Sequence, residues 1–307
     1  MSAMIRKATS VALFLAACVN SYAQTSASPV SDQAQIDPSV MVMTDGWKPS
    51  LRTDGAYDKV KRVGVAIPWA PIRENDVMWK KRIWREIDTR EKINLTFRYP
   101  GEDEEQMGGG MFIEMVFNAI KSGQVTAFST VDERFTTPLS PEDVMNMVLG
   151  TVDTIIQIDA ITGEEKQIIS RREFDPNTVT KFRLKEEWVI DRNQGRMVCR
   201  ILAIAPIIDM YDKTTGDFRG SSPMFWIYYP DLRPVLAKYE AFNPYNDAVR
   251  MTWDDIFEKR FFSSYIIKAS NPYDRSLKDY KEGIERLYEA EKINEEIFNK
   301  EQDLWVN

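Results

Sequence analysis

The spacing of apolar residues changes twice along this chain, and this change constrains the fold more than any other feature. From Asp76 to about Leu95 and from Met111 to Lys121, apolar side chains recur at helical spacing. From about residue 150 to about residue 230 they alternate with polar residues, as in β-strands, and helical spacing then returns. This order predicts an α+β fold, in which an antiparallel sheet of about 4–6 strands packs with N-terminal and C-terminal helices.

Start and stop signals support the helices on either side of the sheet. Asp76 is a suitable N-cap for the first helix, on which Trp79, Ile83 and Ile87 share one face. Ser122–Gly123 is a suitable end for the second helix. Capping boxes and helical spacing predict further helices from Ser140, from Thr252 through residue 268, and from Asp274 to about Lys300.

The strand segments of the middle region are joined by short turns. Ala160–Gly163 and Arg192–Gly195 have turn composition, and connections of this length imply antiparallel pairing. The predicted strands cover 152–158, Lys181–Ile190, Arg196–Ile204 and Met224–Tyr229.

The N-terminus carries an export signal with two incompatible processing sites. Arg6 and Lys7 precede a short apolar run, which has the size of a signal-peptide core. A lipobox ends at Cys18, which would become a lipidated N-terminus. A small-x-small motif instead predicts cleavage between Ala23 and Gln24, which would discard that cysteine.

These signals suggest four parts. We expect a signal peptide over 1–23, an extended N-terminal arm over 24–60, an α+β domain over 61–274, and a C-terminal helix and tail over 275–307. After the signal peptide no stretch approaches twenty apolar residues, so we expect no transmembrane segment.

Composition excludes several classes of function. The chain of 307 residues has no histidine, which excludes Ser-His-Asp and Cys-His catalysis and histidine-ligated metals. Its net charge of -7 disfavours nucleic acid as a partner, because phosphate binding needs a basic surface. The second of its two cysteines, Cys199, alternates with apolar residues and is predicted to be a buried free thiol.

The remaining candidates for chemistry have simpler explanations. Glu102–Glu105 lacks the alternating spacing of a calcium loop and is better explained as a solvated loop. Asp209, Asp212 and Asp217 fit a hairpin turn better than a cation site. Ser263–Ser264 has no histidine to activate it and no nucleophile elbow around it. We therefore expect no catalytic, metal or cofactor site.

Aromatic and arginine side chains are the candidates for partner contacts. Such residues dominate protein–protein hot spots, although a place in the core is the simpler explanation for each of them. The candidates lie in the first and fourth predicted helices: Trp79, Trp84, Arg85, Phe261, Phe262 and Tyr265.

Three long stretches resemble one protein family. They are "VMWKKRIWREIDTREKINLTFRYP" (Val77–Pro100), "MFWIYYPDLRPVLAKYEAFNPYNDA" (Met224–Ala248) and "WDDIFEKRFFSSYIIKASNPYDR" (Trp253–Arg275). The resemblance runs from about Val63 to Tyr288 and is to the gliding motility proteins GldN, called PorN in non-gliding relatives.

The resemblance implies a non-enzymatic, periplasmic component of the type IX secretion and gliding machinery of Bacteroidota. Its partners would be the outer-membrane lipoprotein GldK/PorK, copies of itself in a ring under the outer membrane, and the GldM/PorM shaft. Since the partner supplies the lipid in this family, the resemblance favours cleavage after Ala23 over lipidation of Cys18. A carboxylate-based hydrolase acting on glycans and a monomeric small-ligand binding module are the alternatives.

Overall fold

The computed structural model describes residues 64–99, 111–149, 153–158, 165–170, 175–212, 216–246 and 248–304. The predicted signal peptide and arm, with Cys18, Ala23 and Gln24, lie outside these residues. The acidic loop at Glu102–Glu105 and the turn at Ala160–Gly163 also lie outside them.

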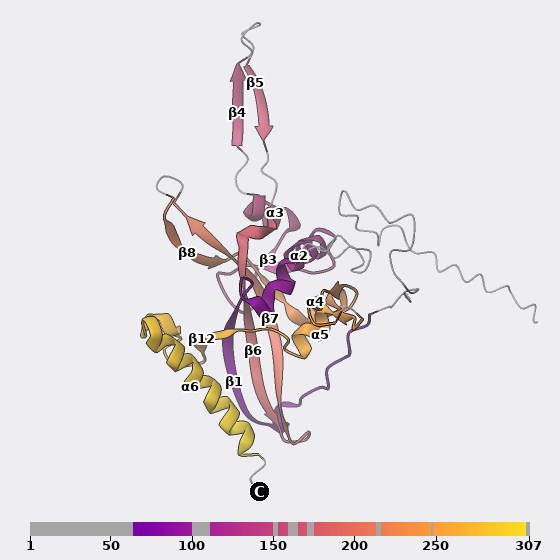
Figure 1. Cartoon of the computed structure of the whole chain (residues 1–307), viewed down its shortest axis with the longest axis vertical. Helices are drawn as coiled ribbons and strands as arrows, with labels where there is room; N and C mark the ends of the chain where they lie inside the picture. Colours follow the sequence, from indigo (N-terminus) through magenta and orange to yellow (C-terminus); the bar gives the residue numbers. More distant parts are fainter. Residues whose placement is uncertain are drawn as a thin grey trace, which may run out of the picture. The chain divides into compact units, whose positions relative to one another are not determined.

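An eight-stranded antiparallel sheet organises the described residues, which confirms the α+β class (Figure 1). The strand order is β12-β1-β6-β7-β9-β2-β3, and β8 pairs with β7 off this path. The strands are β1 (Val77–Asp88), β2 (Ala127–Phe128), β3 (Pro138–Leu139), β6 (Val179–Asp191), β7 (Arg196–Tyr211), β8 (Phe218–Pro223), β9 (Trp226–Tyr228) and β12 (Tyr265–Ala269).

The prediction of about 4–6 strands within residues 150–230 therefore gave too few strands and confined them to too short a part of the chain. The sheet takes strands from residue 77 to residue 269, and its terminal strand β12 comes from a segment predicted as helix. Two further hairpins form separate two-stranded sheets: β4 (Asp153–Ile158) with β5 (Glu165–Ser170), and β10 (Glu240–Ala241) with β11 (Met251–Thr252).

The helices follow several of the predicted capping signals. Ser140 accepts a hydrogen bond from the Asp143 amide at 3.1 Å, and Thr252 accepts one from the Asp255 amide at 3.1 Å. The predicted end at Ser122–Gly123 is confirmed, with Gly123 at a φ of 71°. The helices are α2 (Phe112–Lys121), α3 (Pro141–Leu149), α4 (Tyr229–Leu236), α5 (Trp253–Glu258) and α6 (Gly283–Gln302), with 3-10 turns η2 (Glu74–Asp76), η3 (Lys92–Arg98), η5 (Pro176–Thr178) and η6 (Leu277–Asp279).

The predicted helix over Asp76–Leu95 is wrong, because most of it forms β1 and its end forms η3. Ile83 and Ile87 are four residues apart, and this even spacing puts them on one face of a strand as well as a helix. The residues between and before them on that face are basic, Arg85 and Lys81. Because of these charged residues, the sequence does not show the alternation of apolar and polar side chains that marks a strand.

The fourth predicted helix is also wrong beyond its first turns. It ends at Glu258, and Arg260 adopts a left-handed conformation with a φ of 57°. That conformation usually calls for glycine, so the sequence contains no stop signal. The chain then enters β12, and the C-terminal helix begins at Gly283 rather than Asp274.

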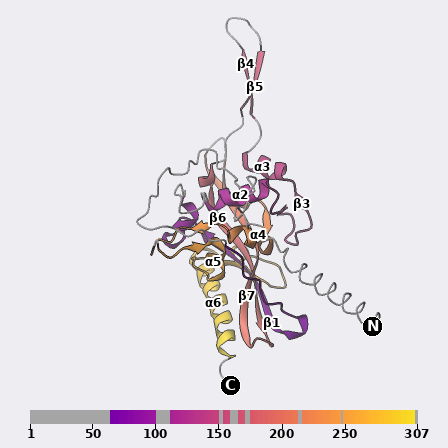
Figure 2. The same ribbon diagram turned by 90° about the vertical axis from the view of Figure 1, so that its right-hand side faces the viewer.

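One face of the sheet, which we call the helix face, carries two apolar clusters. Ile87, Phe182 and Leu184 pack with α2, α4 and α5 in an aromatic core. Ile83, with Trp79 and Trp188 partly buried beside it, packs with Ala290, Ile293 and Ile297 of α6. Figures 1 and 2 show α6 running alongside β1 and the β6–β7 hairpin.

A buried charged cluster lies between these two apolar clusters. The fully buried Glu186 on β6 has one oxygen 2.9 Å from Arg260 Nη1 and the other 3.2 Å from Arg85 Nε. The contacts at Arg85 Nε and Glu186 Oε1 are ionic rather than aligned hydrogen bonds. Trp188 Nε1 donates to Glu186 at 3.2 Å, and Arg85 Nη2 donates to Asn294 of α6 at 2.6 Å. The cluster thus joins β1, β6, α6 and the segment after α5.

Replacing Glu186 by Ala should lower the free energy of unfolding by about 3–5 kcal/mol, because the buried Arg85 and the half-buried Arg260 lose their counter-charge. Glu187→Ala is the matched control. Glu187 points to the other face, where it pairs with the more exposed Lys80 and Arg82, so its loss should cost under about 1 kcal/mol. Urea unfolding measures both. Equal losses would contradict the role given to Glu186.

Candidate interaction site

The six candidate contact residues divide between the two faces of the sheet and a loop. Trp79 and Arg85 lie on the helix face of β1, under α6. Phe261 and Phe262 lie in the loop between α5 and β12, where Phe261 is 53% exposed and Phe262 is buried against Phe257. The other two, Trp84 and Tyr265, lie at one groove on the opposite face, which we call the groove face.

The groove has a volume of about 540 Å³ and is bounded by segments far apart in sequence. Its floor comes from β1, β6 and β12, and its walls come from β8, from Glu133 before β3, and from η6 with the start of α6. A bulge in β12 opposite Trp84 and Arg85 places Ile267 beside Lys268 at the groove. The volume is in the range of sites that bind small molecules or a few side chains.

The floor is held by a charged network around Glu86. Arg183, directly opposite on β6, donates from Nη2 to Glu86 Oε1 at 2.7 Å. Tyr265, opposite on β12, donates its hydroxyl to Glu86 Oε2 at 2.8 Å. Burial and the Glu86 carboxylate together raise the pKa of the Tyr265 phenol. The network therefore favours a neutral tyrosine and fixes the three strands in register.

Trp84 lies between two lysines at the same end of the groove face. The Lys268 and Lys185 ammonium groups are 4.5 Å and 5.9 Å from the centre of its ring. Lys185 is buried and donates to the Glu133 carbonyl at 2.5 Å, and its burial lowers the pKa of its ammonium group although Glu133 opposes this. Trp84 is thus a packed, cation-flanked side chain beneath the surface.

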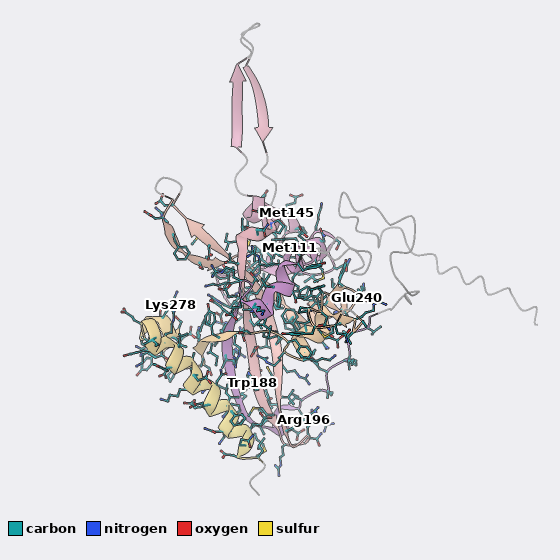
Figure 3. All side chains as sticks on the ribbon, in the orientation of Figure 1. Met111, Met145, Trp188, Arg196, Glu240 and Lys278 are labelled. Carbon is teal, nitrogen blue, oxygen red and sulfur yellow. The ribbon has the colours of Figure 1, made fainter. Side chains whose placement is uncertain are left out.

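The groove carries a surplus of positive charge. The lining has five basic and four acidic side chains. The acidic groups are engaged: Glu86 binds Arg183, Asp274 lies 2.8 Å from Lys268, Glu133 lies 3.8 Å from Lys185, and Asp279 accepts hydrogen bonds from Ser276. The lining cations without an ion pair in the described part of the chain are Lys181, Lys278 and Arg286. Figure 3 shows Lys278 beside the start of α6. Sequence reasoning missed these three, since each looks like an ordinary surface charge until the fold brings them together.

Apolar side chains border the charged lining. Phe218 of β8 is 59% exposed and Leu287 of α6 is 55% exposed, and both line the groove. Ile284 and Tyr288 lie next to Leu287 on the surface of α6 and are also exposed. A cationic groove with an exposed aromatic and aliphatic border suits an anionic, partly apolar polypeptide surface.

The described residues offer little else in the way of chemistry. They contain no group of three or more Cys, Asp or Glu side chains that could hold a metal ion. Asp209 accepts hydrogen bonds from Thr180 and Ser221, in agreement with its place in the β7–β8 hairpin. Cys199 is a free thiol that lies half-buried beside Glu186. Its burial raises the pKa of the thiol, and the Glu186 carboxylate adds to this effect. A raised pKa disfavours the reactive thiolate.

The family of the chain follows from its sequence over this whole region. The model of the family described as "Gliding motility associated protein GldN" matches residues 72–306. This chain belongs to the GldN family. No curated protein sequence matches it. Membership implies a component of the gliding motility and type IX secretion machinery, and the GldN match includes every strand and helix that forms the groove. None of the described helices has the length and hydropathy of a membrane span.

Replacing Tyr265 by Phe should lower the free energy of unfolding by about 1 kcal/mol at neutral pH, because the hydrogen bond to Glu86 is lost. The raised pKa of Tyr265 means that this contribution is fully present below about pH 10 and disappears as the pH rises through the raised pKa. Urea unfolding at pH 7 and about pH 11 should therefore show the difference shrinking.

Tyr273→Phe, at an exposed position stacked with Arg275, is the control for this measurement and should leave stability unchanged. A Tyr265→Phe difference that stays constant or grows with pH would contradict the network around Glu86.

Proposed function

We propose that this GldN-family chain is a non-enzymatic structural subunit of the type IX secretion and gliding machinery. It assembles with copies of itself and with a GldK/PorK-like lipoprotein into a ring under the outer membrane, and it contacts a GldM/PorM-like shaft. The observation that carries this proposal is the family match over residues 72–306. A ring needs interfaces on two different surfaces of each subunit rather than one two-fold patch.

The chemistry of the chain supports a structural role. The full sequence has no histidine, so the commonest general base is missing. The groove has its acidic groups engaged in ion pairs and capping, which leaves cations to meet a partner. The candidate residues Trp84 and Tyr265 contribute by shaping that groove, while Trp79 and Arg85 act through the seating of α6.

We further propose the course of export. Residues 1–23 are a signal peptide, cleavage falls between Ala23 and Gln24, and the mature chain works in the periplasm at the inner face of the outer membrane. Residues 24–60 form an arm, residues 61–274 the α+β domain, and residues 275–307 a C-terminal helix and tail. The lipid anchor belongs to the partner, so Cys18 is removed rather than lipidated.

Native purification tests these proposals together. A tagged chain expressed in its own bacterium should co-purify from detergent-solubilised envelopes with an outer-membrane lipoprotein, and negative-stain images should show rings. The intact mass of the purified chain should correspond to a start at Gln24. An equally tagged periplasmic protein from the same cells serves as the control.

Recovery of the chain alone, without rings or a lipoprotein, would contradict the ring assignment. A mass corresponding to a diacylglyceryl group on Cys18 would contradict the proposed processing and leave the ring assignment standing.

A further inference from the structure

We propose that the groove of one copy receives the outer surface of the second half of α6 from the next copy. This inference rests on the proposed function, since it names the surfaces through which copies meet in a ring. It identifies α6 as the element that carries one contact surface at each of its ends.

The inserted surface is acidic with one aromatic residue. From Glu289 to Asp303 the chain has six acidic and two basic side chains. Glu291, Glu295 and Phe298 fall at helical spacing on one stripe of α6, away from the buried positions that seat the helix. Glu291 and Glu295 have no ion pair in the described part of the chain, and Phe298 is 59% exposed.

The groove complements this stripe both in charge and in its apolar side chains. Lys181, Lys278 and Arg286 supply unpaired positive charge, and Phe218 and Leu287 supply an apolar border for an aromatic ring. A helix laid in a groove typically uses anchors spaced by three, four and seven residues, which is the spacing of Glu291, Glu295 and Phe298. Opposite charges across the contact would set its orientation.

The two surfaces lie at opposite ends of one helix, so the contact is heterologous. The groove meets α6 at its first turn, where Arg286 and Leu287 are, and the acidic stripe ends near residue 298. At 1.5 Å per residue, the stripe is centred roughly 15 Å along the axis from that first turn. A contact between different surfaces repeats from copy to copy and gives a ring when the rotation closes.

Charge also argues for a copy of this chain over other anionic occupants. Two copies with a net charge of -7 each also repel one another at long range, but a membrane surface or a nucleic acid presents its negative field to the whole molecule rather than to the groove alone. A short acidic stripe on a similar subunit meets only the local cationic groove. The same chain therefore carries both halves of one complementary pair.

Cysteine cross-linking tests the contact in assembled complexes. The double variant R286C/E295C is expressed in place of the parent chain, and solubilised complexes are oxidised and separated on a denaturing gel. Both positions are exposed, so the substitutions should not disturb folding. The double variant should give a ladder of covalent multimers, and a mixture of the two single variants should stop at the dimer.

Two controls define the background. The parent chain accounts for its own cysteines, of which Cys199 is half-buried. R286C/Y245C moves the second cysteine to a position that is 84% exposed but lies outside the stripe, and it should give no ladder.

The outcomes separate this inference from the proposed function. Rings that still hold the lipoprotein but give no ladder above the control pair would overturn the α6-to-groove contact and leave the ring subunit standing. Dimers formed by either single variant alone would show a two-fold contact and also overturn it. Loss of both rings and lipoprotein from the parent chain would defeat the proposed function, and this inference with it.

Discussion

The fold depends on one buried carboxylate that serves two arginines. Glu186 lies on β6 between the aromatic core and the apolar cluster beneath α6, and it faces Arg85 of β1 and Arg260 from the segment after α5. Without it, Arg85 would be a buried charge facing the half-buried Arg260 with no counter-charge between them. Because Arg85 also donates to Asn294, the same charge fixes the position of α6 on the sheet.

This arrangement gives the two faces of the sheet different roles. The helix face is closed by α2, α4, α5 and α6, and its side chains are committed to packing. The groove face carries a cross-strand network of the buried Glu86 with Arg183 and Tyr265, which are partly exposed at the groove. The helix that is held by the buried cluster also supplies Arg286 and Leu287 to the groove. Stability on one face therefore positions the contact surface on the other.

Sequence patterns predicted the parts of this fold that local signals control. The α+β class, the hairpin of β6 and β7, and the capped starts of α3 and α5 were all predictable, because capping and turn chemistry act within a few residues. The family was also recognisable from three stretches of sequence, and the match over 72–306 confirms it.

The misplaced elements share a different cause, which is tertiary contact between distant residues. Arg85 interrupts the apolar face of β1 because Glu186, a hundred residues later, neutralises it. Arg260, just after α5, adopts a left-handed conformation in which it contacts Glu186 and Cys199 and lies over the rings of Trp188 and Phe262. The groove was unpredictable for the same reason, since Lys181, Lys278 and Arg286 meet only in the folded sheet. Trp84 and Tyr265 were chosen as aromatic candidates, and the structure places both in the lining of that groove.

Hydrogen–deuterium exchange of the purified chain, compared with the chain in native envelope complexes, tests the division between the two faces most directly. The account predicts that assembly slows exchange in β12, η6 and α6, where the groove and the acidic stripe lie, and leaves the β6–β7 hairpin around Glu186 unchanged. Unchanged exchange in β12, η6 and α6, with new protection confined to other segments, would contradict it.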